Sequence, residues 1–324
     1  MNRLLAYREL EGLTQAELGD LLSISPQLVS AIESGRRSFT GDLGVIGYRP
    51  DRFELPEMSE PLHRLKASTH VSAKKRAKEL LRLAGEVFIE LREITDNAPR
   101  WTLHRRIGPE TLEEWEDAAL EVRRELAVET SGPIKNLTQV VERAGVCVVP
   151  VRDLDGVSGL SAWVGDVPVI GISPNMPGDR CRFTLSHELG HLLHHSSPSP
   201  DIEREANRFA GALLFPRDDF MAAMSERAQL RDFVQLKSSW GVAIAAIIYR
   251  AHELDYIDDS RYRALQIQMA KWRKAEPGSF SAAHGQLLPR LVEVNGGVTK
   301  VATRLGIKGS HLAELVDWRY LRLA

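Results

Sequence analysis

Hydrophobic residues recur three and four positions apart through most of the chain, with polar residues between them. Positions at this spacing share one face of a helix, so each apolar stripe predicts a helix with one buried side. Together the stripes predict a mainly helical protein. They run through residues 111–130, 134–144, 220–240, 242–254 and 260–272.

Three short apolar runs between these helices are instead typical of β-strands. They cover residues 146–151, 159–164 and 167–172, and Asp/Gly turns separate them. We expect residues 167–173 to form the edge strand, because Pro168 lacks the N–H that a central position would use. The fold class that follows is mainly α with a small β-sheet, that is, α+β.

The N-terminal segment predicts two short helices joined by a tight turn. Thr14 and Glu17 have the spacing of a capping box at the start of the first helix. Ser25, followed by Pro26 at the first helical position, predicts the start of the second helix, and Gly35 predicts its end. Two helices with a three-residue turn between them make a helix-turn-helix.

The residues of this segment resemble the XRE (phage-repressor-like) family of DNA-binding domains. The resemblance is carried by Leu13-Thr14-Gln15, Leu18, Leu22, Ile24-Ser25, Val29-Ser30, Ile32-Glu33 and Gly35. It implies that the second helix enters the major groove of DNA, with Gln27, Ser30 and Ala31 facing bases. It also implies that Gln15 and Arg36 lie near phosphates.

The local charge argues against strong DNA binding by this module. Residues 1–37 carry four basic and five acidic side chains, whereas phosphate contacts need local positive charge. Residues 39–51, where the family has further helices, are rich in glycine and have little periodic pattern. The alternative is a helix-turn-helix that serves as a structural or dimerisation module. If it binds DNA, we expect a homodimer on a palindromic site.

Residues 48–61 are rich in proline and are typical of a linker. Residues 62–106 carry eleven basic and five acidic side chains, which makes them the most basic part of the chain. We expect a helix in this segment that begins near Ser72. Its charge allows two interpretations: contact with DNA phosphates beside the helix-turn-helix, or the solvated face of an amphipathic helix.

The C-terminal segment, residues 287–318, holds apolar stripes on both sides of Gly306. A helix, a glycine turn and a second helix follow from this pattern. The pattern fits a second helix-turn-helix and a small packing or dimerisation module equally well.

The strongest chemical signal is a His-Glu-x-x-His sequence that begins at His187 and ends at His191. Two histidines four positions apart lie one turn apart on the same helix face, so both imidazoles can bind one ion. Zinc suits imidazole ligands and leaves a coordination position open for water. Glu188 lies close enough to take the proton of that water as it attacks a carbonyl.

A catalytic zinc site usually has a third protein ligand, and the next helical stripe offers carboxylates. Glu203 and Asn207 are four positions apart, so Glu203 is the preferred ligand and Asn207 a partner that orients an imidazole. Glu205 is rotated about 200° from Glu203 around the helix and is the weaker candidate. The alternative interpretation is that Glu203 and Glu205 are ordinary solvated charges on the surface. Cys181 is a conceivable thiolate ligand, although a small buried residue is the simpler interpretation.

These motifs resemble the ImmA/IrrE family of zinc peptidases over residues 115–276. The resemblance is carried by Phe183-Thr184-Leu185-Ser186-His187-Glu188-Leu189-Gly190-His191, Glu203, Asn207, Phe209-Ala210 and Leu213-Leu214-Phe215-Pro216. It implies a zincin-like, gluzincin-type fold in which His187, His191 and Glu203 bind Zn2+. Glu188 would be the general base. It also implies a protein substrate, typically a transcriptional repressor, and a substrate peptide would pair with the expected edge strand.

The composition is ordinary for a globular protein and excludes a secreted disulfide scaffold. The 324 residues suffice for two or three domains, and 43% of them are hydrophobic and 27% charged. The net charge of −2 indicates no overall attraction to nucleic acid, so DNA binding needs a local patch. The two cysteines have no metal-binding spacing and fit a reducing cytoplasm. No long apolar run predicts a signal peptide or membrane span.

Four regions follow from these patterns: a helix-turn-helix at 1–47, a linker and basic helical segment at 48–108, a zinc peptidase domain at 109–276 and a small helical module at 277–324. The predicted function is a cytoplasmic, DNA-associated regulator with an active zinc endopeptidase domain. The alternative is a DNA-binding repressor or antitoxin-like regulator. In that case the peptidase domain is a sensor or scaffold and cleaves no other protein.

Overall fold

The computed structural model describes residues 2–61, 71–152, 158–196, 200–225, 228–272, 276–278 and 280–318. Over these residues the protein is mainly helical with a three-stranded sheet, so the predicted α+β class is confirmed. The chain divides into two compact units. The first, called the sheet unit, contains Met1–Trp101, Gly145–Pro174 and Gly285–Ala324, and the second, called the helical unit, contains Thr102–Ala144 and Asn175–His284.

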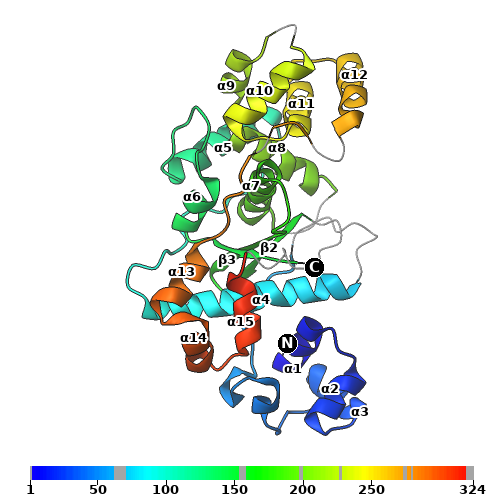
Figure 1. Cartoon of the computed structure of the whole chain (residues 1–324), viewed down its shortest axis with the longest axis vertical. Coiled ribbons are helices and arrows are strands. Elements are labelled where there is room, and N and C mark those ends of the chain that lie inside the picture. The colour runs from blue at the N-terminus through cyan, green and yellow to red at the C-terminus, as the bar shows by residue number, and fades with distance from the viewer. Residues whose placement is uncertain are drawn as a thin grey trace. The chain divides into compact units, whose positions relative to one another are not determined.

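Figure 1 shows the elements along the chain. The sheet unit contains the helices α1 (Arg3–Glu11), α2 (Gln15–Leu22), α3 (Pro26–Glu33), α4 (Val71–Ile94), α13 (Leu287–Val294), α14 (Gly297–Leu305) and α15 (Gly309–Val316), and the short turns η1 (Leu43–Ile46) and η2 (Pro50–Arg52). The helical unit contains α5 (Leu112–Glu125), α6 (Leu137–Arg143), α7 (Gly178–His194), α8 (Ile202–Leu214), α9 (Arg217–Ala223), α10 (Leu230–Trp240), α11 (Ile244–Glu253), α12 (Asp259–Met269) and η3 (Ala270–Trp272). No helix among the described residues is both long and apolar enough to cross a membrane.

The sheet has the strand order β1-β3-β2, formed by β1 (Cys147–Pro150), β2 (Gly159–Val164) and β3 (Val167–Ile172). β3 is parallel to β1 and antiparallel to β2, so it is the central strand and the prediction of an edge strand here is wrong. Pro168 is tolerated because it lies opposite Trp163 of β2, one residue before β1 begins to pair at Val169. Its missing N–H therefore falls where no β1 residue pairs with it.

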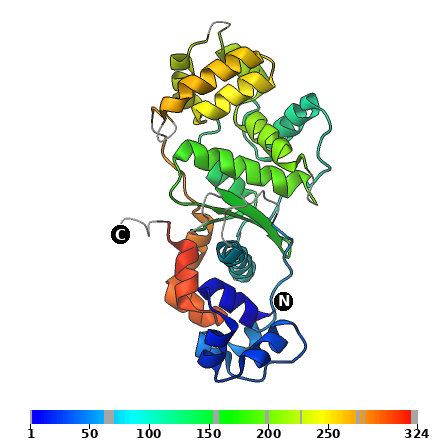
Figure 2. The same cartoon turned by 90° about the vertical axis from the view of Figure 1, so that its right-hand side faces the viewer.

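Helix α4 is the centre of the sheet unit. It packs against the sheet on one side and against α1 on another, as Figures 1 and 2 show. Gly85 permits this close approach, because a Cβ at this position would lie 2.4 Å from the Cβ of Val164. All residues from 80 to 88 are buried, so protein surrounds the middle of this helix. The helix is therefore not a simple amphipathic one with a solvated face.

Much of the positive charge in the predicted basic segment is neutralised within the sheet unit. Residues 62–70 lie outside the described part of the chain, and the described helix begins at Val71, so Ser72 lies within it. Acidic side chains from other parts of the unit, or from α4 itself, pair with five cations of α4. The pairs are Lys75 with Glu9, Arg76 with Glu314, Lys78 with Glu60, Arg82 with Glu79 and Arg92 with Asp166.

The N-terminal helices begin where the capping residues predict. The Thr14 side chain accepts a hydrogen bond from the Glu17 N–H, and the Glu17 carboxylate accepts one from the Thr14 N–H. This reciprocal pair is a capping box. Ser25 caps α3, whose first residue is Pro26. The predicted pair of helices is thus present as α2 and α3.

The C-terminal helices pack against this N-terminal region within one hydrophobic core. Tyr7 of α1 and Ile307, which precedes α15, belong to the same buried cluster. The Tyr48 hydroxyl lies 2.8 Å from Nδ1 of His311, and Nε2 of His311 lies 2.9 Å from Oε1 of Glu11. Of the two alternatives for this segment, these contacts fit the packing module. The stretch after α3 contributes Leu43, Ile46 and Tyr48 to the same core.

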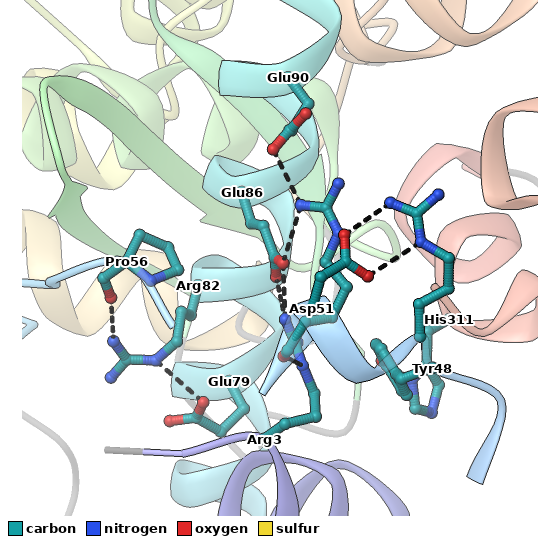
Figure 3. A network of polar contacts seen from close by, with 11 residues as sticks. Arg3, Tyr48, Asp51, Pro56, Glu79, Arg82, Glu86, Glu90 and His311 are labelled. Carbon is teal, nitrogen blue, oxygen red and sulfur yellow. Dashed lines mark hydrogen bonds and ion pairs between the residues drawn. The ribbon is translucent and has the colours of Figure 1, made fainter. Parts of the chain in front are cut away.

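A buried ion pair links the first helix to α4, as Figure 3 shows. Nη2 of Arg3 donates to both carboxylate oxygens of Glu86, at 2.6 and 2.7 Å, and Nε donates to the carbonyl of Arg52 at 2.9 Å. The guanidinium also lies 4.5 Å from the ring centroid of Tyr48. The side chains of Arg3 and Glu86 are 1% and 8% exposed, so these charges need compensation within the protein. Arg3 is the nearer of two cations beside Glu86, since Nη1 of Arg52 lies 3.8 Å from Oε1.

For three predicted helices of the helical unit, the observed bounds differ from the predicted ones. The helix predicted over 111–130 ends at Glu125, and that predicted over 134–144 is the shorter α6. The stripe over 220–240 is two helices, α9 and α10. Buried apolar residues such as Leu126 continue past the helix ends into the loops. Apolar spacing alone therefore does not mark where these helices stop.

Candidate metal centre

Helix α7 carries the His-Glu-x-x-His sequence and is buried along most of its length. Helix α8 packs closely against it at Gly190, where a Cβ would lie 2.9 Å from Cδ1 of Phe209. The hydroxyl of Ser186 donates to the carbonyl of Arg182 within the helix, at 3.0 Å. Because the backbones of α7 and α8 are held by this packing, the direction in which the histidines leave α7 is fixed.

Two histidines of α7 and one glutamate of α8 converge on one point. The Nε2 atoms of His187 and His191 are 3.0 Å apart. Oε2 of Glu203 lies 3.5 Å from Nε2 of His187, and Oε1 lies 3.6 Å from Nε2 of His191. One ligand atom from each residue lies within 4.8 Å of the others, as in a group that could hold a metal ion. The structure thus brings together the three residues that the sequence suggests as ligands.

The other two residues singled out around this motif lie next to the cluster. Oδ1 of Asn207 is 2.9 Å from Nδ1 of His187, so the amide oxygen can accept the Nδ1 proton and leave Nε2 for a metal. Glu188 follows His187 on α7, and its side chain is buried, with 3% of the residue exposed. Both positions suit their suggested parts, Asn207 in orienting a ligand and Glu188 in proton transfer.

The electrostatic environment of the cluster favours positive charge. Burial lowers the pKa of His187, but the hydrogen bond that its ring donates to the Glu203 carboxylate, the charges of Glu188 and Glu203, and the contact with Asn207 outweigh this effect. The net pKa of His187 is therefore raised above its ordinary value. A negative potential that stabilises an imidazolium also stabilises a bound cation.

The sequence reasoning missed a second row of polar contacts behind His191. Nδ1 of His191 lies 3.0 Å from Nδ1 of His195, and Nε2 of His195 lies 3.1 Å from Oε2 of Glu205. Glu205 therefore contacts His195, and Glu203 is the glutamate that belongs to the cluster. The four-residue spacing of His191 and His195 was the available signal, since it repeats the spacing of His187 and His191.

The donor set fits a zinc ion. Two imidazole nitrogens and one carboxylate oxygen are a known ligand set of catalytic zinc sites. The Nδ1 atoms of both imidazoles have partners, as is usual for histidines that ligate through Nε2. The side chain of Glu203 is 25% exposed, so solvent reaches the cluster. Cys181 does not belong to the described cluster, and burial raises the pKa of its thiol to about 11, which disfavours the thiolate that a metal needs.

Comparison with protein families gives two matches. Residues 142–252 match the model of the IrrE N-terminal-like domain of a peptidase family, and residues 4–43 match a helix-turn-helix model. Two segments of the chain are therefore similar to known domains, residues 142–252 to the ImmA/IrrE family and residues 4–43 to XRE-type helix-turn-helix domains. No curated protein shows significant similarity to the chain. All three residues of the cluster, together with Glu188, Asn207 and the His195–Glu205 contact, lie within the ImmA/IrrE-type match.

The XRE-type match contains the residues suggested as DNA contacts, and their surroundings differ. Nε2 of Gln15 donates to Oε2 of Glu33 at 2.8 Å, so this amide is already bound within the domain. Gln27 is exposed on α3, and Ser30 is partly buried on the same helix. Arg36 follows α3 and is exposed. Four of the five suggested residues therefore lie on or next to α3, with Ala31 also on this helix, and Gln15 is engaged with a carboxylate.

Proposed function

We propose that this protein is a DNA-associated transcriptional regulator whose ImmA/IrrE-type domain is a zinc-dependent endopeptidase acting on a protein target, specifically a repressor. The convergence of His187, His191 and Glu203 beside the buried Glu188 carries this proposal. A domain that only sensed a metal would need the ligands but would have no need of Glu188. The match of the N-terminal segment to a helix-turn-helix model supports the regulatory part.

The chain's own side chains would divide the work in the following way. His187, His191 and Glu203 would hold the ion, with Asn207 orienting His187. Bound zinc supplies Lewis acidity, which polarises a carbonyl and lowers the pKa of water. Glu188 would take the proton from the attacking water and deliver it to the departing amine, so that one carboxylate acts first as base and then as acid.

The helix-turn-helix would place α3 in the major groove of DNA. Gln27 and Ser30 would face base edges, and Arg36 would bind a phosphate. Gln15 would reach a phosphate only by releasing its hydrogen bond to Glu33. Because XRE-type domains read palindromic sites, we propose a homodimer on DNA.

Metal content tests the ligand set directly. We expect the purified protein to bind about one zinc ion per chain, as three protein ligands and an open position allow. His187→Ala and Glu203→Ala should each lose it, because each variant removes a ligand. Elemental analysis after dialysis measures the content, and His252→Ala is the matched control. His252 is a histidine of α11 that lies 2.8 Å from Asp259, and its variant should keep the metal.

Two results would contradict parts of this proposal. A wild-type protein that takes up no zinc, even after incubation with added zinc, would favour the alternative of a DNA-binding repressor or antitoxin-like regulator with a scaffold domain. Zinc lost in His187→Ala but kept in Glu203→Ala would retain the enzyme and exclude Glu203 as the third ligand.

DNA binding can be tested through Gln27 on α3 and Arg36 after it, both of which are exposed. Arg36→Ala should weaken binding to all sequences and reduce the salt dependence by about one phosphate contact. Gln27→Ala should instead relax the preference at one base pair, with a loss of about 1–3 kcal/mol for the preferred site. Fluorescence anisotropy on a selected operator measures both effects, with Arg100→Ala as an exposed control in the same unit. Wild-type protein that binds no DNA even at low salt would leave the helix-turn-helix as a packing module.

A further inference from the structure

His195 and Glu205 form a polar pair, here called the His195–Glu205 pair, that lies behind His191 as seen from the metal cluster. His195 directly follows α7 as its C-terminal cap. Its backbone is extended, and its N–H donates to the carbonyl of His191 at 3.1 Å. The residue is 8% exposed. The ring is therefore held at a fixed place, with one nitrogen toward His191 and the other toward α8.

The hydrogen bonds of this pair allow one arrangement of protons when a metal is bound. His191 faces the cluster with Nε2, so this nitrogen must keep its lone pair and the proton must be on Nδ1. The partner of that proton is Nδ1 of His195, at 3.0 Å, which must then act as the acceptor. The proton of His195 is consequently on Nε2, where it donates to Oε2 of Glu205 at 3.1 Å.

We infer that His195 and Glu205 are positioning residues for the metal centre, which hold His191 in the tautomer and orientation that zinc needs. The inference rests on the proposed zinc site. It adds a chain of three side chains in which the Glu205 carboxylate fixes His195 and His195 fixes His191. A carboxylate at the end of such a chain also makes the ligating nitrogen a stronger donor.

The two ligating histidines are supported in different ways. Asn207 is a neutral partner of His187, and it can offer either its oxygen or, after a flip, its NH2 group to Nδ1. His191 is instead connected to a carboxylate through a second imidazole. The His191–His195–Glu205 row therefore defines which nitrogen of His191 carries the proton. A neutral amide alone would allow either tautomer.

The neighbouring His194 shows that burial on this helix end does not by itself make a positioning residue. Its ring lies edge-on to Trp115, with centroids 5.1 Å apart, and 5.1 Å from the ring of Phe209. These contacts are those of a packing side chain among aromatic rings. His195 differs because both of its ring nitrogens face polar partners.

Zinc affinity, measured by competition with a chelator of known affinity, tests the inference on the full chain. His195→Phe keeps the ring volume but removes the acceptor, and we expect about 10- to 100-fold weaker binding. His195→Gln keeps an acceptor oxygen for His191 and should recover most of the affinity. Glu205→Gln removes the fixed charge and should weaken binding about tenfold. His252→Phe is the matched control, since that histidine also pairs with a carboxylate, and it should bind as the wild type does.

The results separate this inference from the function on which it rests. Failure of the wild type to bind zinc would refute both. If His195→Phe and Glu205→Gln both bind zinc with wild-type affinity, the inference is overturned and the proposed function stands. The same holds if His195→Gln loses as much zinc affinity as His195→Phe. Thermal unfolding of the zinc-free proteins shows whether a variant is folded. If His195→Phe does not fold, the zinc affinity of Glu205→Gln decides between the outcomes. The Glu205 side chain is 27% exposed, so the protein should tolerate this change.

Discussion

Replacing Glu188 with glutamine is expected to abolish peptide-bond hydrolysis while zinc stays bound. Glutamine keeps the size of the side chain but cannot accept a proton, so we expect a loss of at least about 10²- to 10⁴-fold. Glu188 is not among the residues of the metal-binding cluster, so the zinc content should match that of the wild type. Mass spectrometry of new protein termini in cells that produce either protein would detect the cleavage whichever protein is the target.

The matched control is Glu121→Gln, which changes an exposed glutamate of α5 and should leave cleavage intact. Unchanged cleavage by zinc-loaded Glu188→Gln would show that another group is the base. A different outcome concerns regulation: if gene control by Glu188→Gln equals that of the wild type although cleavage is lost, proteolysis has no part in the regulation.

The second large effect is expected in the sheet unit, at the ion pair of Arg3 and Glu86. Arg3→Met leaves the buried Glu86 carboxylate with only the more distant Arg52, whose Nη1 lies 3.8 Å from Oε1. Glu86→Leu leaves the buried Arg3 guanidinium without the carboxylate that it pairs with. Each single change should lower the free energy of unfolding by about 3–5 kcal/mol. The double variant should lose much less than the sum, because no unpaired buried charge remains. Urea unfolding followed by circular dichroism measures these differences.

An exposed pair in the same unit provides the comparison. Arg100 lies 3.1 Å from Glu93, and their side chains are 60% and 56% exposed. Arg100→Met should change the stability by less than about 0.5 kcal/mol, since solvent screens such pairs. Equal effects of Arg3→Met and Arg100→Met, or additive effects in the double variant at Arg3 and Glu86, would contradict the role given to burial.

The parts of the molecule that the sequence predicts well depend on short-range geometry. His187 and His191 meet because four residues make about one helical turn, and the caps at Thr14 and Ser25 act within three residues. Glu203 could be selected because it shares a face with Asn207 on the next helix. The same rule of spacing, applied once more to His195, would have found the contact behind His191.

The parts that could not be predicted depend on partners far away in the chain. A charge count over the basic segment says nothing of Glu314, which lies 238 residues from its partner Arg76. Strand order also depends on distant residues. Pro168 shows that one backbone N–H is missing from β3, but the sequence does not show that β1 begins to pair only at Val169, which lets β3 be the central strand. For the same reason, the packing of the C-terminal helices against α1 could not be read from their own pattern.

The chain changes from one compact unit to the other at residues 101–102, 144–145, 174–175 and 284–285. Neither unit is therefore encoded by an uninterrupted stretch of the gene. In a protein built of consecutive domains, recombination near residue 47 would exchange the N-terminal module as a whole. Here it would separate Leu4 and Leu10 from core residues that lie later in the chain. The helix-turn-helix, the sheet and the last three helices must accordingly be inherited and engineered together.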